Sequence, residues 1–159
     1  MKILIAGCSG FLGKFITNES VKNGFEIYGI DIIESSNKNI IFEKCDLSNY
    51  DKLDEIFKKV KPDYVYNLSA LSDIDECIKK PLVCVTSNIL GNTNILDLCT
   101  KYKVKKFIFA SSVYASGNYG GFYASSKKSS EMLIKNYNEF YNLDYVILRY
   151  GTLYGVNAP

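Results

Sequence analysis

Histidine is absent from this chain of 159 residues. Its absence removes the usual general base of enzymes and the commonest metal ligand, so any catalysis must use Tyr, Lys, Asp, Glu, Ser or Cys. The five cysteines are scattered and never spaced C-x-x-C, so the sequence indicates neither a zinc site nor a disulfide framework. We therefore expect no bound metal, and free buried thiols in a reducing compartment.

Long apolar runs and a strong excess of charge are also missing. No stretch approaches the ~18 apolar residues that are needed to cross a bilayer. A formal net charge of +2 argues against a nucleic-acid surface. Residues 1–7 are too short, and too soon interrupted by glycine, for a signal peptide. We expect a cytoplasmic protein that binds neither membranes nor nucleic acids.

Short runs rich in Ile, Val, Phe and Tyr alternate with stretches of helical period. The expected strands cover residues 2–6, 26–30, 40–43, 64–68, 106–110 and 145–148, and the expected helices cover 11–23, 50–60, 81–102 and 123–141. This alternation predicts a parallel sheet with helices on both faces, which is a doubly wound α/β domain. Two residues, Ser48 and Asn49, are candidate caps for the helix that begins at residue 50.

A glycine-rich loop, G-x-x-G-x-x-G over residues 7–13, joins the first expected strand to the first expected helix. Gly7 can form the tight turn, Gly10 lets backbone N–H groups approach a pyrophosphate, and Gly13 lets the helix pack closely. Asp31 follows at the tip of the second strand, where a carboxylate can accept hydrogen bonds from both ribose hydroxyls and repel a 2′-phosphate. The pattern favours NAD over NADP; an ordinary strand-end turn residue is the alternative for Asp31.

The loop spacing together with Tyr123-x-x-x-Lys127 resembles the short-chain dehydrogenase/reductase superfamily. Four further stretches resemble its extended branch, the NAD-dependent nucleotide-sugar epimerases and dehydratases of the UDP-glucose 4-epimerase type. They are Asn67-Leu68-Ser69-Ala70, the segment around Asn88, Phe109-Ala110-Ser111-Ser112, and the segment 148–155, LRYGTLYG. The similarity runs over the whole chain.

The resemblance implies a Rossmann fold over residues 1–159. Relatives continue into a C-terminal domain that grips the nucleotide-sugar. We expect this chain to lack that domain, and to expose apolar surface near Tyr150 and Leu153 as a result. The resemblance also implies a homodimer that pairs through the helices over 81–102 and 123–141.

The resemblance assigns roles to individual residues. It implies that Ser112, Tyr123 and Lys127 are catalytic, and the family pattern selects Ser112 over Ser111. The expected cofactor-binding residues are Gly7, Ser9, Gly10, Phe11, Leu12, Gly13, Asp31, Asp46, Leu47, Leu68, Ser69, Ala70, Asn88, Tyr123 and Lys127. Asp46 can bond an adenine amino group, or it can simply start the next helix.

A free tyrosine has a pKa of about 10 and is a poor base at neutral pH. Because a Lys ammonium and the positive charge of oxidised nicotinamide both favour the phenolate, we expect the pKa of Tyr123 to fall toward working pH. We expect Lys127 to hold the nicotinamide ribose as well. Ser112 would hydrogen-bond the substrate hydroxyl and steady the developing carbonyl.

Related dehydratases carry an Asp-Glu pair directly after the catalytic Ser or Thr, where this sequence has Val113 and Tyr114. This difference favours a 4-epimerase that acts on a UDP-linked sugar through a transient 4-keto intermediate. An NAD-dependent sugar dehydrogenase or reductase needs the same three catalytic residues. A dinucleotide-binding module without turnover is the alternative from another class of protein.

Overall fold

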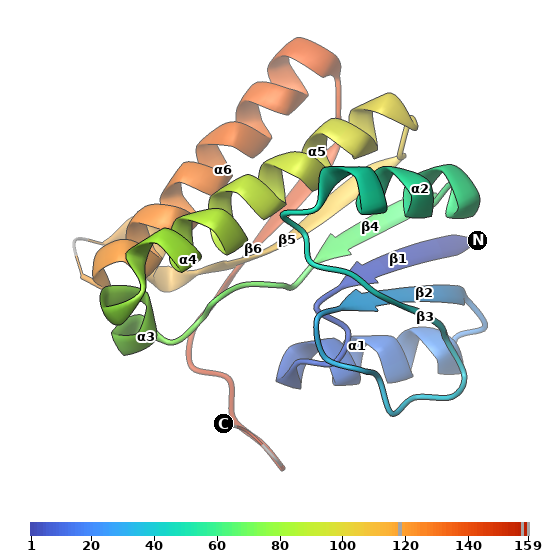
Figure 1. The fold of residues 1–159 in the computed structure, drawn as a ribbon, viewed down its shortest axis with the longest axis horizontal. Helices are drawn as coiled ribbons and strands as arrows, with labels where there is room; N and C mark the ends of the chain where they lie inside the picture. Colours follow the sequence, from blue (N-terminus) through green and yellow to red (C-terminus); the bar gives the residue numbers. More distant parts are fainter. Residues whose placement is uncertain (118, 157, 159) are drawn as a thin grey trace.

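A single parallel sheet organises the computed structural model, which describes residues 1–117, 119–156 and 158. Its six strands lie in the order β3-β2-β1-β4-β5-β6 (Figure 1). They are β1 (Lys2–Ala6), β2 (Glu26–Asp31), β3 (Ile41–Lys44), β4 (Tyr64–Asn67), β5 (Lys106–Ser112) and β6 (Tyr145–Tyr150). The strand order turns back between β1 and β4, as in a doubly wound fold, so the predicted fold class is confirmed.

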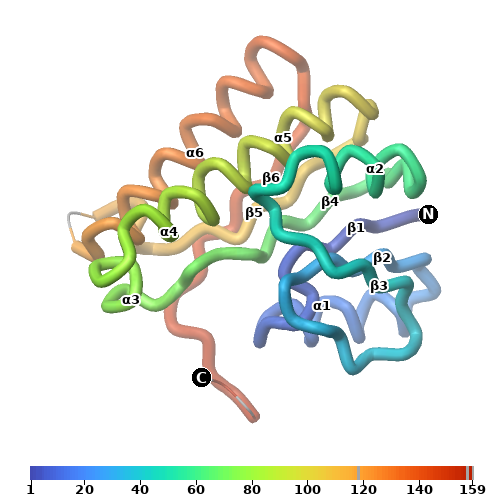
Figure 2. Tube along the Cα trace, in the orientation of Figure 1, coloured from blue at the N-terminus to red at the C-terminus, as the bar shows by residue number. Residues whose placement is uncertain are grey.

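The described part of the chain also forms six α-helices. They are α1 (Phe11–Lys22), α2 (Tyr50–Val60), α3 (Ile74–Lys79), α4 (Pro81–Val85), α5 (Gly91–Lys101) and α6 (Gly121–Tyr141). Figure 1 shows α2, α5 and α6 on one face of the sheet and α1 on the other. After β6 the chain leaves the sheet as an extended tail (Figure 2). Among the described residues, none of the helices has the length and apolarity to span a bilayer.

The apolar core is divided by the sheet into two unequal clusters. The larger cluster lies under α2, α5 and α6 and contains fully buried side chains such as Phe57, Leu96 and Phe107. The smaller one lies under α1 and is built around Ile3 and Ile5. All five cysteines are buried and free, as expected.

The expected helix over 81–102 is not continuous. A π-helical turn over Thr86–Leu90 separates α4 from α5. The Asn88 side chain inside this turn accepts a hydrogen bond from the Leu71 N–H at 2.7 Å and donates to Ser126 Oγ at 2.9 Å. These long-range bonds explain the wider turn, because they hold Asn88 where a regular α-helix would rotate it away.

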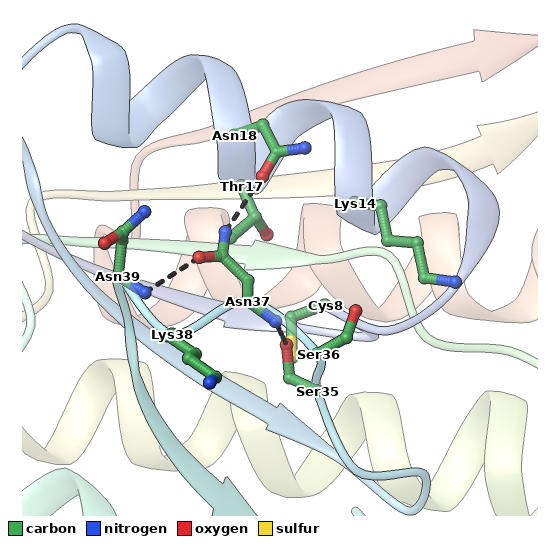
Figure 3. Close-up of a pocket in the computed structure, with 9 residues that line it drawn as sticks. All are labelled: Cys8, Lys14, Thr17, Asn18, Ser35, Ser36, Asn37, Lys38 and Asn39. Carbon is green, nitrogen blue, oxygen red and sulfur yellow. Dashed lines mark hydrogen bonds between the residues drawn. The ribbon is translucent and has the colours of Figure 1, made fainter.

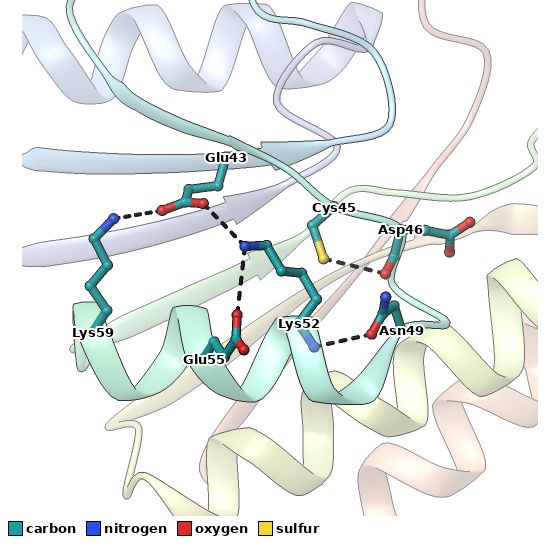
Figure 4. Close-up of polar contacts among 7 residues, drawn as sticks. All are labelled: Glu43, Cys45, Asp46, Asn49, Lys52, Glu55 and Lys59. Carbon is teal, nitrogen blue, oxygen red and sulfur yellow. Dashed lines mark hydrogen bonds and ion pairs between the residues drawn. The ribbon is translucent and has the colours of Figure 1, made fainter.

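Asn49, rather than Ser48, caps α2 (Figure 4). Its Oδ1 accepts the backbone N–H of Lys52 at 3.0 Å, whereas the Ser48 hydroxyl turns back to Asp46 at 2.8 Å. The Lys52 ammonium also lies 3.8 Å from the Glu43 carboxylate on β3. The polar surface of α2 is therefore tied to the edge of the sheet.

Candidate active site

The glycine loop has the close contacts that only glycine allows. Gly7 has φ of +81°, and a Cβ there would lie 2.7 Å from the backbone nitrogen of Ser69. A Cβ on Gly13 would lie 1.9 Å from the Gly7 carbonyl oxygen. Gly10 is the N-cap residue of α1 and offers no capping side chain. The first N–H groups of α1 therefore remain suited to an anion such as a pyrophosphate.

Asp31 at the end of β2 contacts the glycine loop directly. Its Oδ2 accepts the Ser9 N–H at 2.9 Å, and its Oδ1 accepts the Ile33 N–H at 3.0 Å. The Ser9 hydroxyl donates to the Ile33 carbonyl at 2.8 Å, which closes a small network. Asp31 also lines a cavity of about 170 Å³ beyond the carboxyl ends of β2 and β3. This is where dinucleotides bind in open α/β sheets.

A second cavity, of about 450 Å³, contains the expected catalytic side chains. Ser112 ends β5, while Tyr123 and Lys127 lie one turn apart on α6. All three line this cavity together with Phe11 and Leu12 from the start of α1. The fold therefore brings the Tyr-x-x-x-Lys motif and the end of the glycine loop to one space.

Lys127 is only 3% exposed, and its ammonium donates to the Ala110 carbonyl at 2.8 Å. The Nζ atom lies 4.7 Å from the centroid of the Phe109 ring and 5.9 Å from that of Tyr123. Burial lowers the pKa of Lys127 to about 8. The side chain is thus held by the backbone of β5 beside the phenol.

The pKa of the Tyr123 phenol in the chain alone is governed by its burial. In the chain alone burial raises it, and the nearby Ser112 hydroxyl opposes that rise. The expected decrease concerns Tyr123 with oxidised nicotinamide bound beside it, and it stays a prediction. In that state the Lys127 ammonium and the positive charge of oxidised nicotinamide would both favour the Tyr123 phenolate.

A third cavity, of about 330 Å³, lies between α1 and residues 35–39 (Figure 3). Asn37 crosses it and donates to Asn18 Oδ1 at 2.8 Å. The backbone N–H of Asn39 donates to Asn37 Oδ1 at 2.9 Å. The lining is polar and contains none of the expected site residues, so this cavity is separate from the one with Tyr123.

Comparison with known proteins decides the family. The sequence model of the NAD-dependent epimerase/dehydratase family matches residues 3–159. The chain belongs to this family. The family uses NAD as its cofactor. The close backbone contacts of the glycine loop and the position of Asp31 at the end of β2 both fit a bound dinucleotide.

Individual epimerases are similar over almost the whole chain. A putative UDP-glucose 4-epimerase from Methanocaldococcus jannaschii is 32% identical over 96% of this chain and 56% of its own length. The UDP-glucose 4-epimerase of Thermotoga maritima, solved with UDP-glucose, is 28% identical with a TM-score of 0.93 over 98% of this chain and 57% of that one. The Thermus thermophilus enzyme, solved with NAD, is 27% identical with a TM-score of 0.90 over 98% and 56%. The chain spans about half the length of the relatives it matches.

The expected site residues of this family member fall into four groups. The first cavity is lined by Asp31, Asp46, Leu47, Ser69 and Ala70. The second cavity is lined by Phe11, Leu12, Leu68, Ala70, Ser112, Tyr123 and Lys127. Gly7, Ser9, Gly10 and Gly13 belong to the loop before α1 or its first turn. Asn88 lines neither of these two cavities, because its amide is engaged with Leu71 and Ser126.

A buried carboxylate near the site, Glu131, was not among the expected residues. Glu131 lies on α6 four positions after Lys127 and pairs with Arg149 of β6 at 2.6 Å. The i, i+4 spacing from Lys127 was the available signal, since such residues share a helix face.

The tail after β6 leaves apolar side chains accessible. Leu153 is 40% exposed and Tyr150 is only partly buried, as expected, and both line the second cavity. Partly exposed apolar side chains of β6 and the tail therefore form part of the lining of this cavity.

Proposed function

We propose that this chain is the NAD-binding domain of a nucleotide-sugar 4-epimerase that acts on a UDP-linked sugar through a 4-keto intermediate. One observation carries the proposal: Ser112, Tyr123 and Lys127 line a single cavity with residues of the glycine loop. The similarity to UDP-glucose 4-epimerases supports the substrate class.

The roles of the side chains follow from their chemistry. The Tyr123 phenolate takes the proton of the sugar hydroxyl as a general base and later returns it. Ser112 Oγ donates a hydrogen bond to the sugar oxygen as it gains carbonyl character. The Lys127 ammonium stabilises the phenolate. Bound NAD would supply the hydride acceptor and donor for this reaction.

The residues after Ser112 favour epimerisation over dehydration. Val113 and Tyr114 line the same cavity, and neither supplies a carboxylate that could exchange a proton at the neighbouring carbon. A dehydrogenase or reductase would use the same three catalytic residues, so the products must distinguish the two reactions.

The test compares the parent with Tyr123→Phe, with Tyr141→Phe at an exposed position of α6 as the control. With NAD and UDP-glucose or UDP-galactose, we expect the parent to form the other epimer. Turnover should fall by about 10²- to 10⁴-fold in Tyr123→Phe, the usual contribution of a general base. NAD affinity, measured by calorimetry, should stay within about twofold, because the Phe ring keeps the packing.

Three other outcomes would change the proposal. NADH without epimer would indicate a dehydrogenase. NAD binding without any product would indicate a dinucleotide-binding module. A parent that does not bind NAD would contradict the assigned site itself.

We also propose a homodimer that pairs through α4, α5 and α6. Exposed apolar side chains on these helices support it, including Leu82 at 77% exposed on α4 and Met132 at 60% exposed on α6. Sedimentation of the parent should give a dimer, and Met132→Glu should shift it toward monomer, because a buried unpaired charge weakens an interface. A monomeric parent would contradict the pairing.

A further inference from the structure

Glu131 is a buried charged group that the reaction described above does not use. It lies one turn after Lys127 on α6 and is 4% exposed. Its Oε1 accepts the Ser111 hydroxyl at 2.6 Å and the Arg149 Nε at 2.9 Å, and its Oε2 accepts Arg149 Nη2 at 2.6 Å. Both carboxylate oxygens are therefore engaged, and three secondary-structure elements meet at this side chain.

One partner of Glu131 precedes Ser112 in β5, and the other bonds to the turn that follows Ser112. Ser111 is the preceding residue of β5, and it is paired in register with Arg149 of β6. Arg149 also donates through Nη1 to Ser116 Oγ at 3.0 Å, at the end of the 3₁₀ turn that follows Ser112. The strand end before Ser112 and the turn after it are thus both connected to one carboxylate through charge-assisted hydrogen bonds.

The charge of Glu131 also acts on Lys127. The Arg149 guanidinium holds the pKa of Glu131 below its usual range, so its carboxylate is ionised at neutral pH. After burial, the groups that act on the pKa of Lys127 are Cys84 on α4, Cys77 on α3 and Glu131, and all three raise it. Because Glu131 lies one helical turn after Lys127, its carboxylate supplies a negative charge that opposes deprotonation of the buried ammonium.

We propose that Glu131 is a positioning residue of the candidate site, which fixes Ser112 through Ser111 and Arg149 and favours the ammonium form of Lys127. The inference rests on the proposed function, because that function gives Ser112 and Lys127 their roles. It adds a residue that neither the Tyr-x-x-x-Lys motif nor the glycine loop contains.

The first test measures the Lys127 titration, which needs neither cofactor nor substrate. The chain is labelled with ¹³C at the lysine ε carbons, and the Lys127 signal is assigned by its loss in Lys127→Met. We expect the parent signal to titrate near pH 8. In Glu131→Gln it should titrate at a lower pH, whereas Glu139→Gln, at an exposed position of the same helix, should match the parent. An unchanged titration in Glu131→Gln would overturn the charge effect.

The second test measures positioning in the catalytic assay. We expect Glu131→Ala to lower kcat roughly tenfold or more while the Kd for NAD stays within about twofold, since misplacement of reacting groups affects the chemical step. Glu131→Gln should recover part of the loss, because its amide oxygen can still accept the Ser111 hydroxyl. Equal turnover in Glu131→Ala and the parent would overturn the inference, as would a parallel loss of NAD binding. A parent without turnover would count against the proposed function, and the Lys127 titration would then decide the role of Glu131.

Discussion

The Ser9 backbone N–H donates a 2.9 Å hydrogen bond to Oδ2 of Asp31, so the residue expected to contact the cofactor ribose also anchors the glycine loop. The other carboxylate oxygen accepts the Ile33 N–H at 3.0 Å. A substitution at Asp31 therefore removes a ribose acceptor and loosens the loop in one step.

We predict that Asp31→Ala weakens NAD binding by about 10- to 100-fold, the size expected for lost hydrogen bonds to a charged group. Glu34→Ala, a nearby exposed carboxylate, is the control and should bind as the parent does. Calorimetric titration with NAD measures both. An Asp31→Ala protein with the affinity of the parent would show that Asp31 plays no part in cofactor binding.

The buried Lys127 ammonium should make the free energy of unfolding depend on pH. Its pKa is lowered from 10.5 to about 8 by burial. Below pH 8 the side chain is charged in both states, and the folded state carries the full cost of burying the ammonium. Between pH 8 and 10.5 the unfolded chain binds more protons, so this cost declines and stability rises with pH.

The matched comparison is Lys127→Met, which has no such titration. We expect the unfolding free energy of the parent to gain about 3 kcal/mol relative to Lys127→Met between pH 7 and 10.5, at about 1.4 kcal/mol per pKa unit. Denaturant unfolding at several pH values gives the difference, in which the other titrating groups cancel. A difference that stays constant over this range would mean that the ammonium is not desolvated.

Gly13 predicts a steric effect on stability. An added Cβ would lie 1.9 Å from the Gly7 carbonyl oxygen, whereas one on Gly151 would have no neighbour within 4 Å. Gly13→Ala should lower the unfolding free energy by about 1–3 kcal/mol, the usual cost of overpacking, or more because the contact is with backbone. Gly151→Ala should change it by less than about 0.5 kcal/mol. Thermal unfolding of both variants checks this, and equal midpoints would refute the close packing of α1.

The cap of α2 gives a prediction that separates two neighbouring residues. Asn49→Ala should cost about 1 kcal/mol, because the Lys52 N–H loses its acceptor. Ser48→Ala should cost less than about 0.5 kcal/mol, because the Ser48 hydroxyl bonds an exposed carboxylate. Urea unfolding of the two variants measures the contrast. The reverse order would assign the cap to Ser48.

The sheet could be predicted from the sequence because strands buried on both faces appear as short, continuous apolar runs. The break between α4 and α5 could not, because it depends on bonds from Asn88 to residues 17 and 38 positions away. No local pattern contains that information. The helix α3 did leave a local signal that was missed: Asp73 caps it at the Glu76 N–H, as in a D-x-x-E capping pattern.

The candidate site likewise has features that follow from local spacing and features that depend on the folded structure. The motifs placed Ser112, Tyr123 and Lys127 on the elements where the structure has them, because strand ends and helix faces follow from spacing alone. The direction of the Tyr123 pKa shift could not be inferred in this way, since it depends on burial. The hydrogen bond from Lys127 to the Ala110 carbonyl could not be predicted either, because it forms only when the side chain is buried against β5.

The unequal packing of the two faces of the sheet should determine which helices unfold locally first. The cluster around Ile3 and Ile5 under α1 is much smaller than the one under α2, α5 and α6. Amide protons of α1 should therefore exchange with solvent before those of α5, because local opening follows the density of apolar contacts. The N–H groups suited to the pyrophosphate belong to this weaker layer. Cofactor concentration would then set how long α1 stays folded against the sheet, since a ligand stabilises the state that binds it.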